Sequence, residues 1–275
     1  MKQLWLIFLV LILLFQSGCD VDHGLAPLPG KLKTRVAFRG TPPENTQGVY
    51  LIVAPEFPPH AINELFQSPN SLPTNQDTVW TEIDLPYGHY EAFGLWWYSK
   101  DTRSNLADIL TMPFDGVTQE PIGFDVTPDQ PVVEKVLNAN WNNMKRDAEL
   151  KGTVHFEGDF PENTDIIAVA AFTYQPTTAI QYLVWMKSID ITIIPGVKSH
   201  QFVLPVKSGF IGYIAVFWLA ENAALTDVQI VAEARDPDDE TELWEKTIAA
   251  NQTIDDIQIH VDWNNLQPVF SEEIP

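Results

Sequence analysis

The chain has 275 residues, and its 37 acidic residues outnumber its 16 basic ones, which gives a formal net charge of −21. Such a charge argues against binding to nucleic acid or to anionic lipid, because both need an excess of basic side chains. A single cysteine leaves no partner for an internal disulfide, so each domain must be held together by its apolar core.

The first residues have the features of a secretory signal. A positive start, Met1-Lys2, precedes a run of 12 apolar residues from Leu4 to Phe15. This run is too short to span a bilayer, which takes about 20 apolar residues. Ser17-Gly18-Cys19 then resembles the end of a bacterial lipobox, although Gln16 stands where that pattern prefers leucine. We therefore expect residues 1–18 to be a lipoprotein signal peptide; the alternative is ordinary secretion with an unused cysteine.

Lipidation is expected at Cys19, the only cysteine of the chain. Residues 19–30 are polar and contain proline, so they form a tether between the lipid and the first strand. These features predict an exported protein that is anchored to a membrane of the bacterial envelope through Cys19. The membrane and the leaflet are left open.

The rest of the chain contains one pattern twice. Residues 32–46, LKTRVAFRGTPPENT, match residues 150–164, LKGTVHFEGDFPENT, at nine of 15 positions. Further on, Trp141-Asn142-Asn143 recurs as Trp263-Asn264-Asn265. Ordered matches at a nearly constant offset predict two copies of one domain, residues 31–143 and 144–275.

Within each copy the pattern is that of successive short strands. In the first strand Val36 and Phe38 alternate with Arg35, Ala37 and Arg39, and Val154 and Phe156 share one face in the same way in the second copy. Period-two alternation marks a strand with one buried face, and a glycine with a Pro-Glu-Asn-Thr segment supplies the following turn. The predicted fold class is all-β, with two tandem antiparallel sandwiches of transthyretin-like or immunoglobulin-like type. Later expected strands include 78–84, 180–186, 189–194 and 254–263.

The run Leu150-Lys151-Gly152-Thr153-Val154 resembles the first strand of carboxypeptidase regulatory-like, or transthyretin-like, domains of Bacteroidetes-type surface lipoproteins. The first copy differs, with Thr34-Arg35 in place of Gly152-Thr153. The resemblance implies a sandwich fold and an envelope location. It implies a non-catalytic role and transfers no functional residue.

A search for catalytic motifs favours a protein that is not an enzyme. None of the six histidines has a second histidine at a spacing of two to five, and neither a nucleophile elbow nor a phosphate-binding glycine loop is present. A site assembled from distant residues remains possible, because catalytic groups are brought together by the fold. No cofactor is expected.

The acidic loop at residues 236–240 is the best candidate for a metal site. Its four carboxylates could surround calcium, which takes six to eight oxygen ligands, although the spacing is not that of an EF-hand. A solvated hairpin tip is the favoured interpretation, and a calcium site is the alternative. The four residues are Asp236, Asp238, Asp239 and Glu240.

Two strands are apolar on both faces, near residues 90–98 and 210–219. A strand with one solvated face should be polar on that face. Three interpretations remain: the second face is covered by a connecting segment such as 106–114, it forms the contact between the copies, or it is an open aromatic platform. The residues of such a ligand-binding platform would be Trp96, Trp97, Tyr98 and Trp218.

The sequence therefore predicts a non-catalytic envelope lipoprotein that binds a polysaccharide or another envelope protein through aromatic strand faces. The alternative is a structural or assembly subunit of an outer-membrane or surface complex, with no small ligand.

Overall fold

The computed structural model describes residues 28–100, 106–118 and 120–265. The expected signal peptide, Cys19 and most of the tether therefore lie outside the described residues. Within the described ranges the regular secondary structure is almost entirely β-strand, with one short α-helix and several 3-10 turns. None of the described helices has the length and apolar character needed to cross a membrane.

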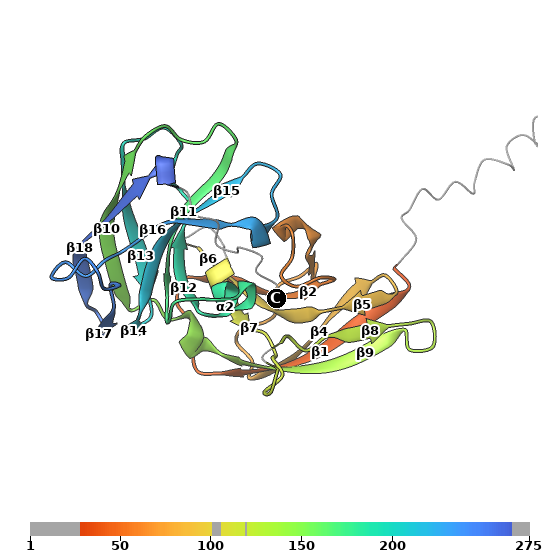
Figure 1. The fold of residues 1–275 in the computed structure, drawn as a ribbon. Helices are drawn as coiled ribbons and strands as arrows, with labels where there is room; N and C mark the ends of the chain where they lie inside the picture. Colours follow the sequence, from red (N-terminus) through yellow and green to blue (C-terminus); the bar gives the residue numbers. More distant parts are fainter. Residues whose placement is uncertain (1–27, 101–105, 119, 266–275) are drawn as a thin grey trace, which may run out of the picture.

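The first copy is a β-sandwich, as the sequence predicts (Figure 1). A three-stranded sheet in the order β4-β1-β9 packs against a four-stranded sheet in the order β3-β2-β6-β7, and one apolar core fills the space between them. The strands are β1 (Gly30–Arg39), β2 (Thr46–Ala54), β3 (Phe66–Gln67), β4 (Thr78–Leu85), β6 (Ala92–Ser99), β7 (Ile109–Thr111) and β9 (Val132–Asn140), and β5 (Gly88–Tyr90) pairs with β8 (Phe124–Val126).

The second copy repeats this arrangement. Its sheets have the orders β13-β10-β18 and β12-β11-β15-β16, with a separate apolar core between them. The strands are β10 (Ala148–Glu157), β11 (Thr164–Phe172), β12 (Met186–Asp190), β13 (Ser199–Val206), β15 (Tyr213–Ala220), β16 (Gln229–Glu233) and β18 (Thr253–Asp262), and β14 (Gly209–Ile211) pairs with β17 (Lys246–Ile248).

The sheets are mixed, which corrects the expectation of purely antiparallel ones. The first strand of each copy pairs antiparallel with one neighbour but parallel with the last strand of the same copy: β1 with β9, and β10 with β18. A parallel pair needs a crossover rather than a hairpin. Here the intervening strands of the opposite sheet supply that crossover. Alternation within single strands does not indicate which strands pair, so the sequence pattern could not predict the parallel pairs.

Each core is closed by a stacked pair of aromatic rings at matching positions. Phe38 lies on Trp141 with ring centroids 5.2 Å apart, and Phe156 lies on Trp263 with centroids 5.9 Å apart. Both tryptophans are buried. The shared geometry follows from the duplicated sequence.

The boundary between the copies lies slightly later than the sequence predicts. Met144 still packs in the first core, and the second core begins at Ala148. The copies touch each other directly. The 3-10 turn η2 (Leu106–Asp108) lies beside β12, and the Leu225 backbone N–H donates to the His60 carbonyl at 3.1 Å.

The one described α-helix, α2 (Ala179–Val184), replaces most of the strand expected at residues 180–186. Thr178 ends the preceding extended segment and caps the helix, because its side-chain oxygen accepts from the Gln181 N–H. Tyr182 then packs edge-on against Phe172 and Phe217, so the helix covers the outer face of the second copy's four-stranded sheet. Burial of this face selects the helix over the strand that the apolar run favours.

Candidate functional site

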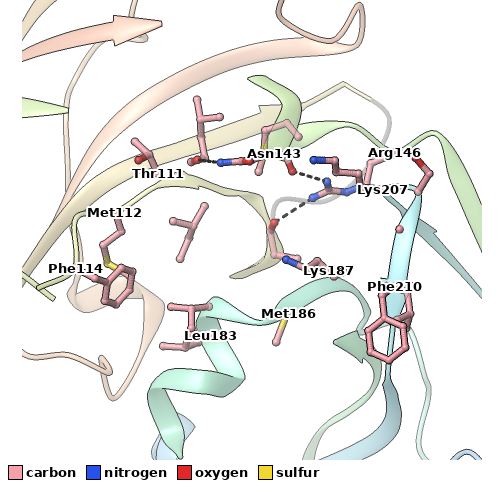
Figure 2. A pocket seen from close by; sticks show the side chains of 18 residues that line it. Thr111, Met112, Phe114, Asn143, Arg146, Leu183, Met186, Lys187, Lys207 and Phe210 are labelled. Carbon is pink, nitrogen blue, oxygen red and sulfur yellow. Dashed lines mark hydrogen bonds between the residues drawn. The ribbon is translucent and has the colours of Figure 1, made fainter. Parts of the chain in front are cut away.

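A cavity of about 450 Å³ lies between the two copies (Figure 2). The first copy contributes η2, β7 and the turn η3 (Trp141–Met144), and the second contributes α2, the start of β12 and the turn from β13 to β14. Pockets at domain interfaces are common binding sites, because two surfaces can contribute polar and apolar groups to one ligand.

Three basic side chains meet at this cavity: Arg146, Lys187 and Lys207. They come from three separate elements, namely the segment after η3, strand β12 and the turn after β13. Figure 2 shows Arg146, Lys187 and Lys207 among the side chains that line the cavity, and the charges of Arg146 and Lys207 both act on Lys187. Such a concentration of positive charge is unusual in a chain with a net charge of −21.

The Arg146 guanidinium is fixed in place by backbone carbonyls. Nη1 donates to the carbonyls of Asn143 and Lys145 at 3.2 and 3.0 Å, and Nη2 donates to that of Ala107 at 3.1 Å. The Asp108 carboxylate lies 3.6 Å from Nη2. Arg146 thus connects η2 of the first copy to the linker, the short segment 145–147 between the two cores. Burial lowers the pKa of its guanidinium despite the nearby Asp108.

The charge of Lys187 is the least compensated of the three. Burial lowers the pKa of its ammonium, and the positive charges of Arg146 and Lys207 lower that pKa further. Within the described parts of the chain, neither Lys187 nor Lys207 forms an ion pair. The cavity therefore holds more positive than negative charge, and an anion placed in it would offset the repulsion.

The turn that carries Lys207 is held by the residue after Arg146. Asp147 accepts the Ser208 backbone N–H at 2.7 Å and the Ser208 hydroxyl at 3.2 Å. The backbone hydrogen bond from Ser208 is the main reason that the pKa of the Asp147 carboxyl is lowered. Two consecutive linker residues thereby position two sides of the cavity.

The remaining wall is mostly apolar. A ligand that fits this cavity would combine an anionic group with an apolar body, because cationic ends and apolar side chains share the space. The apolar side chains around the cations in Figure 2 are Met112, Phe114, Leu183, Met186 and Phe210.

No protein-family model matches the sequence, and no curated protein matches it either. Among solved structures, the chain is similar to a leucine-rich repeat protein from Bacteroides thetaiotaomicron (11% identity, TM-score 0.33, 85% of this chain and 26% of that chain). It is also similar to a candidate adhesin from Bacteroides ovatus (12% identity, TM-score 0.27, 85% of this chain and 93% of that chain). A third similar structure is a candidate cell adhesion protein from Bacteroides fragilis (11% identity, TM-score 0.23, 88% of this chain and 100% of that chain). The chain thus spans about a quarter of the first of these proteins. At such TM-scores these likenesses assign no function.

The structure buries three of the four residues of the expected aromatic platform. Trp96, Trp97 and Trp218 are 4%, 2% and 7% exposed, so they do not form an open platform, and this interpretation is corrected. Trp97 and Trp218 point into the two cores. Tyr98 is partly exposed, and its hydroxyl donates to Gln67 at 2.8 Å.

Connecting segments cover the second faces instead. In the second copy the cover is α2, the connection between β11 and β12. In the first copy Met112, just after β7, lies against Gly94: a side chain on Gly94 would come within 3.3 Å of the Met112 Cβ and 2.6 Å of the Thr111 carbonyl oxygen. The segment 106–114 therefore covers part of this face, as one of the three interpretations proposed.

The acidic loop does not gather its carboxylates around one point. Asp236 accepts the Asp238 N–H at 2.8 Å, and Asp239 accepts the Thr241 N–H and hydroxyl at 3.0 and 2.7 Å. Asp236 is half-buried, Asp238, Asp239 and Glu240 are exposed, and the hydrogen bonds of Asp236 and Asp239 stabilise their own turn. Across the described ranges, no group of three or more His, Cys, Asp or Glu residues is placed to hold a metal ion.

The cationic cavity was not identified from the sequence. In the sequence Arg146 is one of several polar residues near the start of the second copy, and Lys187 and Lys207 lie 41 and 61 residues further along the chain. The available signal was the scarcity of basic residues, which makes any cluster of them notable, but only the packing of the copies brings these three together.

Proposed function

We propose that the protein is a non-catalytic binding protein of the bacterial envelope that holds an anionic ligand in the cavity between its two sandwiches. The ligand class is a carboxylate or phosphate attached to an apolar or partly apolar body. The convergence of Arg146, Lys187 and Lys207 on a cavity with apolar walls carries this proposal.

Electrostatics supports a bound anion over an empty cavity. Like charges that are partly removed from water repel one another more strongly than they do in solvent. An anion between the two lysines would replace this repulsion with charge-assisted hydrogen bonds. The Arg146 guanidinium already donates hydrogen bonds to three backbone carbonyls. We therefore assign the direct contacts with the anion to Lys187 and Lys207, and a positioning role to Arg146.

The test is a series of thermal melts of the mature protein at constant ionic strength. The probes are acetate, octanoate, galacturonate and inorganic phosphate, with chloride as the reference salt. A ligand at about 100 times its Kd adds about 2.7 kcal/mol to the free energy of unfolding, which raises the midpoint by several degrees. Lys187→Met and Lys207→Met should each reduce this rise, because methionine keeps the apolar stem and removes the charge.

The matched control is Lys198→Met, which removes the charge of an exposed lysine outside the cavity. It should leave the ligand-induced rise intact. A rise that persists unchanged in Lys187→Met would contradict the proposed site. No rise with any of the four anions would instead favour the structural or assembly role, in which the two copies serve as a rigid spacer.

Membrane anchoring through Cys19 belongs to the same proposal and is supported by the sequence alone. A Cys19→Ala variant should move from the membrane fraction to the soluble fraction of cells and lose labelling by a palmitate analogue. Retention of the variant in the membrane fraction would contradict anchoring at this residue.

A further inference from the structure

One tryptophan lies open on the surface of the first copy. Trp80, on β4, is 60% exposed, whereas most large aromatic residues of the described chain pack in cores. Its strand is an edge of the sheet β4-β1-β9, at the lower right in Figure 1. Across that sheet Trp80 stands level with Arg35 on β1 and Val136 on β9, and both of these side chains are exposed too.

The second copy shows that the fold does not need this tryptophan. The same row of the equivalent sheet consists of Thr153, Gln201 and Gln258, paired in the same way. The position that holds Trp80 in one copy therefore holds a glutamine in the other. An exposed tryptophan with no structural requirement points to binding, because a large apolar surface in water favours association.

A cleft of about 380 Å³ runs beside Trp80, between the edge of β4 and the segment 68–73. Its lining is rich in hydroxyl, amide and carboxylate groups, which suit the many hydroxyls of a sugar. A pyranose ring presents an apolar C–H face and a rim of hydroxyls, so an open aromatic ring beside polar groups matches both parts. The polar residues with exposed or half-exposed side chains are Asn70, Ser71, Thr81, Glu82 and Asp84.

We propose that Trp80 and this cleft form a binding site for a neutral polysaccharide, with one sugar ring stacked on the indole. We expect a neutral rather than an anionic polysaccharide, because the carboxylates of Glu82 and Asp84 line the cleft and would repel an anionic one. Lys31 forms ion pairs with both carboxylates and orients them as hydrogen-bond acceptors. A protein partner fits less well, since the hot spots of protein interfaces lie in well-packed, fully desolvated pockets, whereas this cleft is lined mostly by hydroxyl, amide and carboxylate groups.

This site is independent of the cavity between the copies. None of the residues that line the Trp80 cleft lines that cavity. Failure of one proposal therefore leaves the other standing, and one set of variants separates them. Lys187→Met should keep polysaccharide binding, and a Trp80 variant should keep stabilisation by anions.

The experiment compares wild-type protein with Trp80→Gln, which installs the residue of the second copy and should fold normally. Val136→Gln is the matched control, because it also copies the second repeat and changes an exposed apolar neighbour. Binding to laminarin, xyloglucan, galactomannan and dextran is measured by affinity electrophoresis and by calorimetry with the intact mature chain. We expect at least one polysaccharide to bind, with affinity reduced by about tenfold or more in Trp80→Gln and kept in Val136→Gln.

Equal binding by wild-type protein and Trp80→Gln would overturn the proposal, and so would the failure of all four neutral polysaccharides to bind. Binding that is lost in Trp80→Gln only for an envelope protein, with no polysaccharide bound, would also overturn it. Melting curves of each variant without ligand check that the fold is retained.

Discussion

Gly152 and Phe202 stand opposite each other on β10 and β13, and the phenyl ring fills the space that a side chain on Gly152 would take. A Cβ on Gly152 would lie 2.6 Å from the Phe202 Cζ and 2.1 Å from the Ile257 carbonyl oxygen. In the first copy the equivalent pair is Thr34 and Thr81. The two copies thus fill the same part of the core differently: the first divides the volume evenly between two threonines, and the second places nearly all of it on Phe202.

This relationship predicts a non-additive pair of substitutions. Gly152→Ala should lower the free energy of unfolding by about 1–3 kcal/mol through overpacking, and Phe202→Thr by about 3–5 kcal/mol through a cavity. The double variant should lose less than the sum, because the new methyl group enters the vacated space. It should not regain wild-type stability, since the Ile257 carbonyl still crowds the position. Urea denaturation of all four proteins measures the coupling, and strict additivity would contradict the proposed contact.

A hydrogen bond that is repeated in both copies gives a second prediction. Trp97 Nε1 donates to the Thr46 hydroxyl at 2.9 Å, and Trp218 Nε1 donates to the Thr164 hydroxyl at 2.9 Å. Thr46→Val leaves the buried indole N–H without an acceptor and should cost about 1–3 kcal/mol of stability. Thr164→Val should have a similar cost, which denaturant midpoints can check.

Trp96→Phe is the matched control for this hydrogen bond. The Trp96 Nε1 is buried and has no hydrogen-bond partner among the described residues, and the equivalent position of the second copy holds Phe217. Trp96→Phe, which removes this N–H, should therefore lower the free energy of unfolding clearly less than Thr46→Val does. A larger cost for Trp96→Phe would show that ring volume, rather than hydrogen bonding, governs these sites.

Lys187 predicts a pH-dependent difference between wild-type protein and Lys187→Met. Because its pKa is lowered on folding, the unfolded chain binds this proton more tightly, and the charged ammonium destabilises the native state. Without ligand, the variant should therefore be more stable than wild type at pH 7. The difference should shrink as the pH rises through the lowered pKa towards the ordinary value of 10.5. Melts in non-coordinating buffers test this, and a variant less stable at pH 7 would contradict the unfavourable charge.

Asp147 gives a further prediction, because its charge stabilises the native state whereas the charge of Lys187 destabilises it. Its carboxyl has a lowered pKa, so its ionised form stabilises the native state at pH values above the ordinary 3.8. That stabilisation is lost as the pH falls through the lowered value. Asp147→Asn should be less stable than wild type at pH 7 and should lose less of its stability on acidification. Asp159→Asn, at an exposed position, should follow the wild-type curve.

The duplication and the sandwich were accessible from the sequence because they depend on local patterns. The alternation of Val36 and Phe38 with Arg35, Ala37 and Arg39 indicates which face of β1 is buried, and the fold repeats this in β10. The same kind of pattern marked Trp80, which shares its parity with Thr78, Glu82 and Asp84 on the exposed face of β4. The alternation in this strand is therefore sufficient to place Trp80 on the exposed face.

Long-range relationships were not accessible. Parallel pairing of β10 with β18 stacks His155 on His260 at 4.9 Å, although 105 residues separate them in the numbering. The cationic cavity depends in the same way on how η2, β12 and the β13–β14 turn are packed. Neither arrangement leaves a periodic trace in the chain, because it arises from tertiary packing rather than from local conformation.

The parallel pairing of first and last strands also determines how each copy responds to pulling. In the first copy the ladder runs from Lys31 beside Val132 to Arg39 beside Asn140, so the chain enters at one end of the ladder and leaves at the other. Tension between the two ends of the copy therefore slides β1 and β9 past each other and loads all of their hydrogen bonds at once. Hydrogen bonds loaded in shear must break together, whereas those of a peeled hairpin break one by one. A tether attached ahead of β1 would thus transmit force along the most resistant direction of the sandwich.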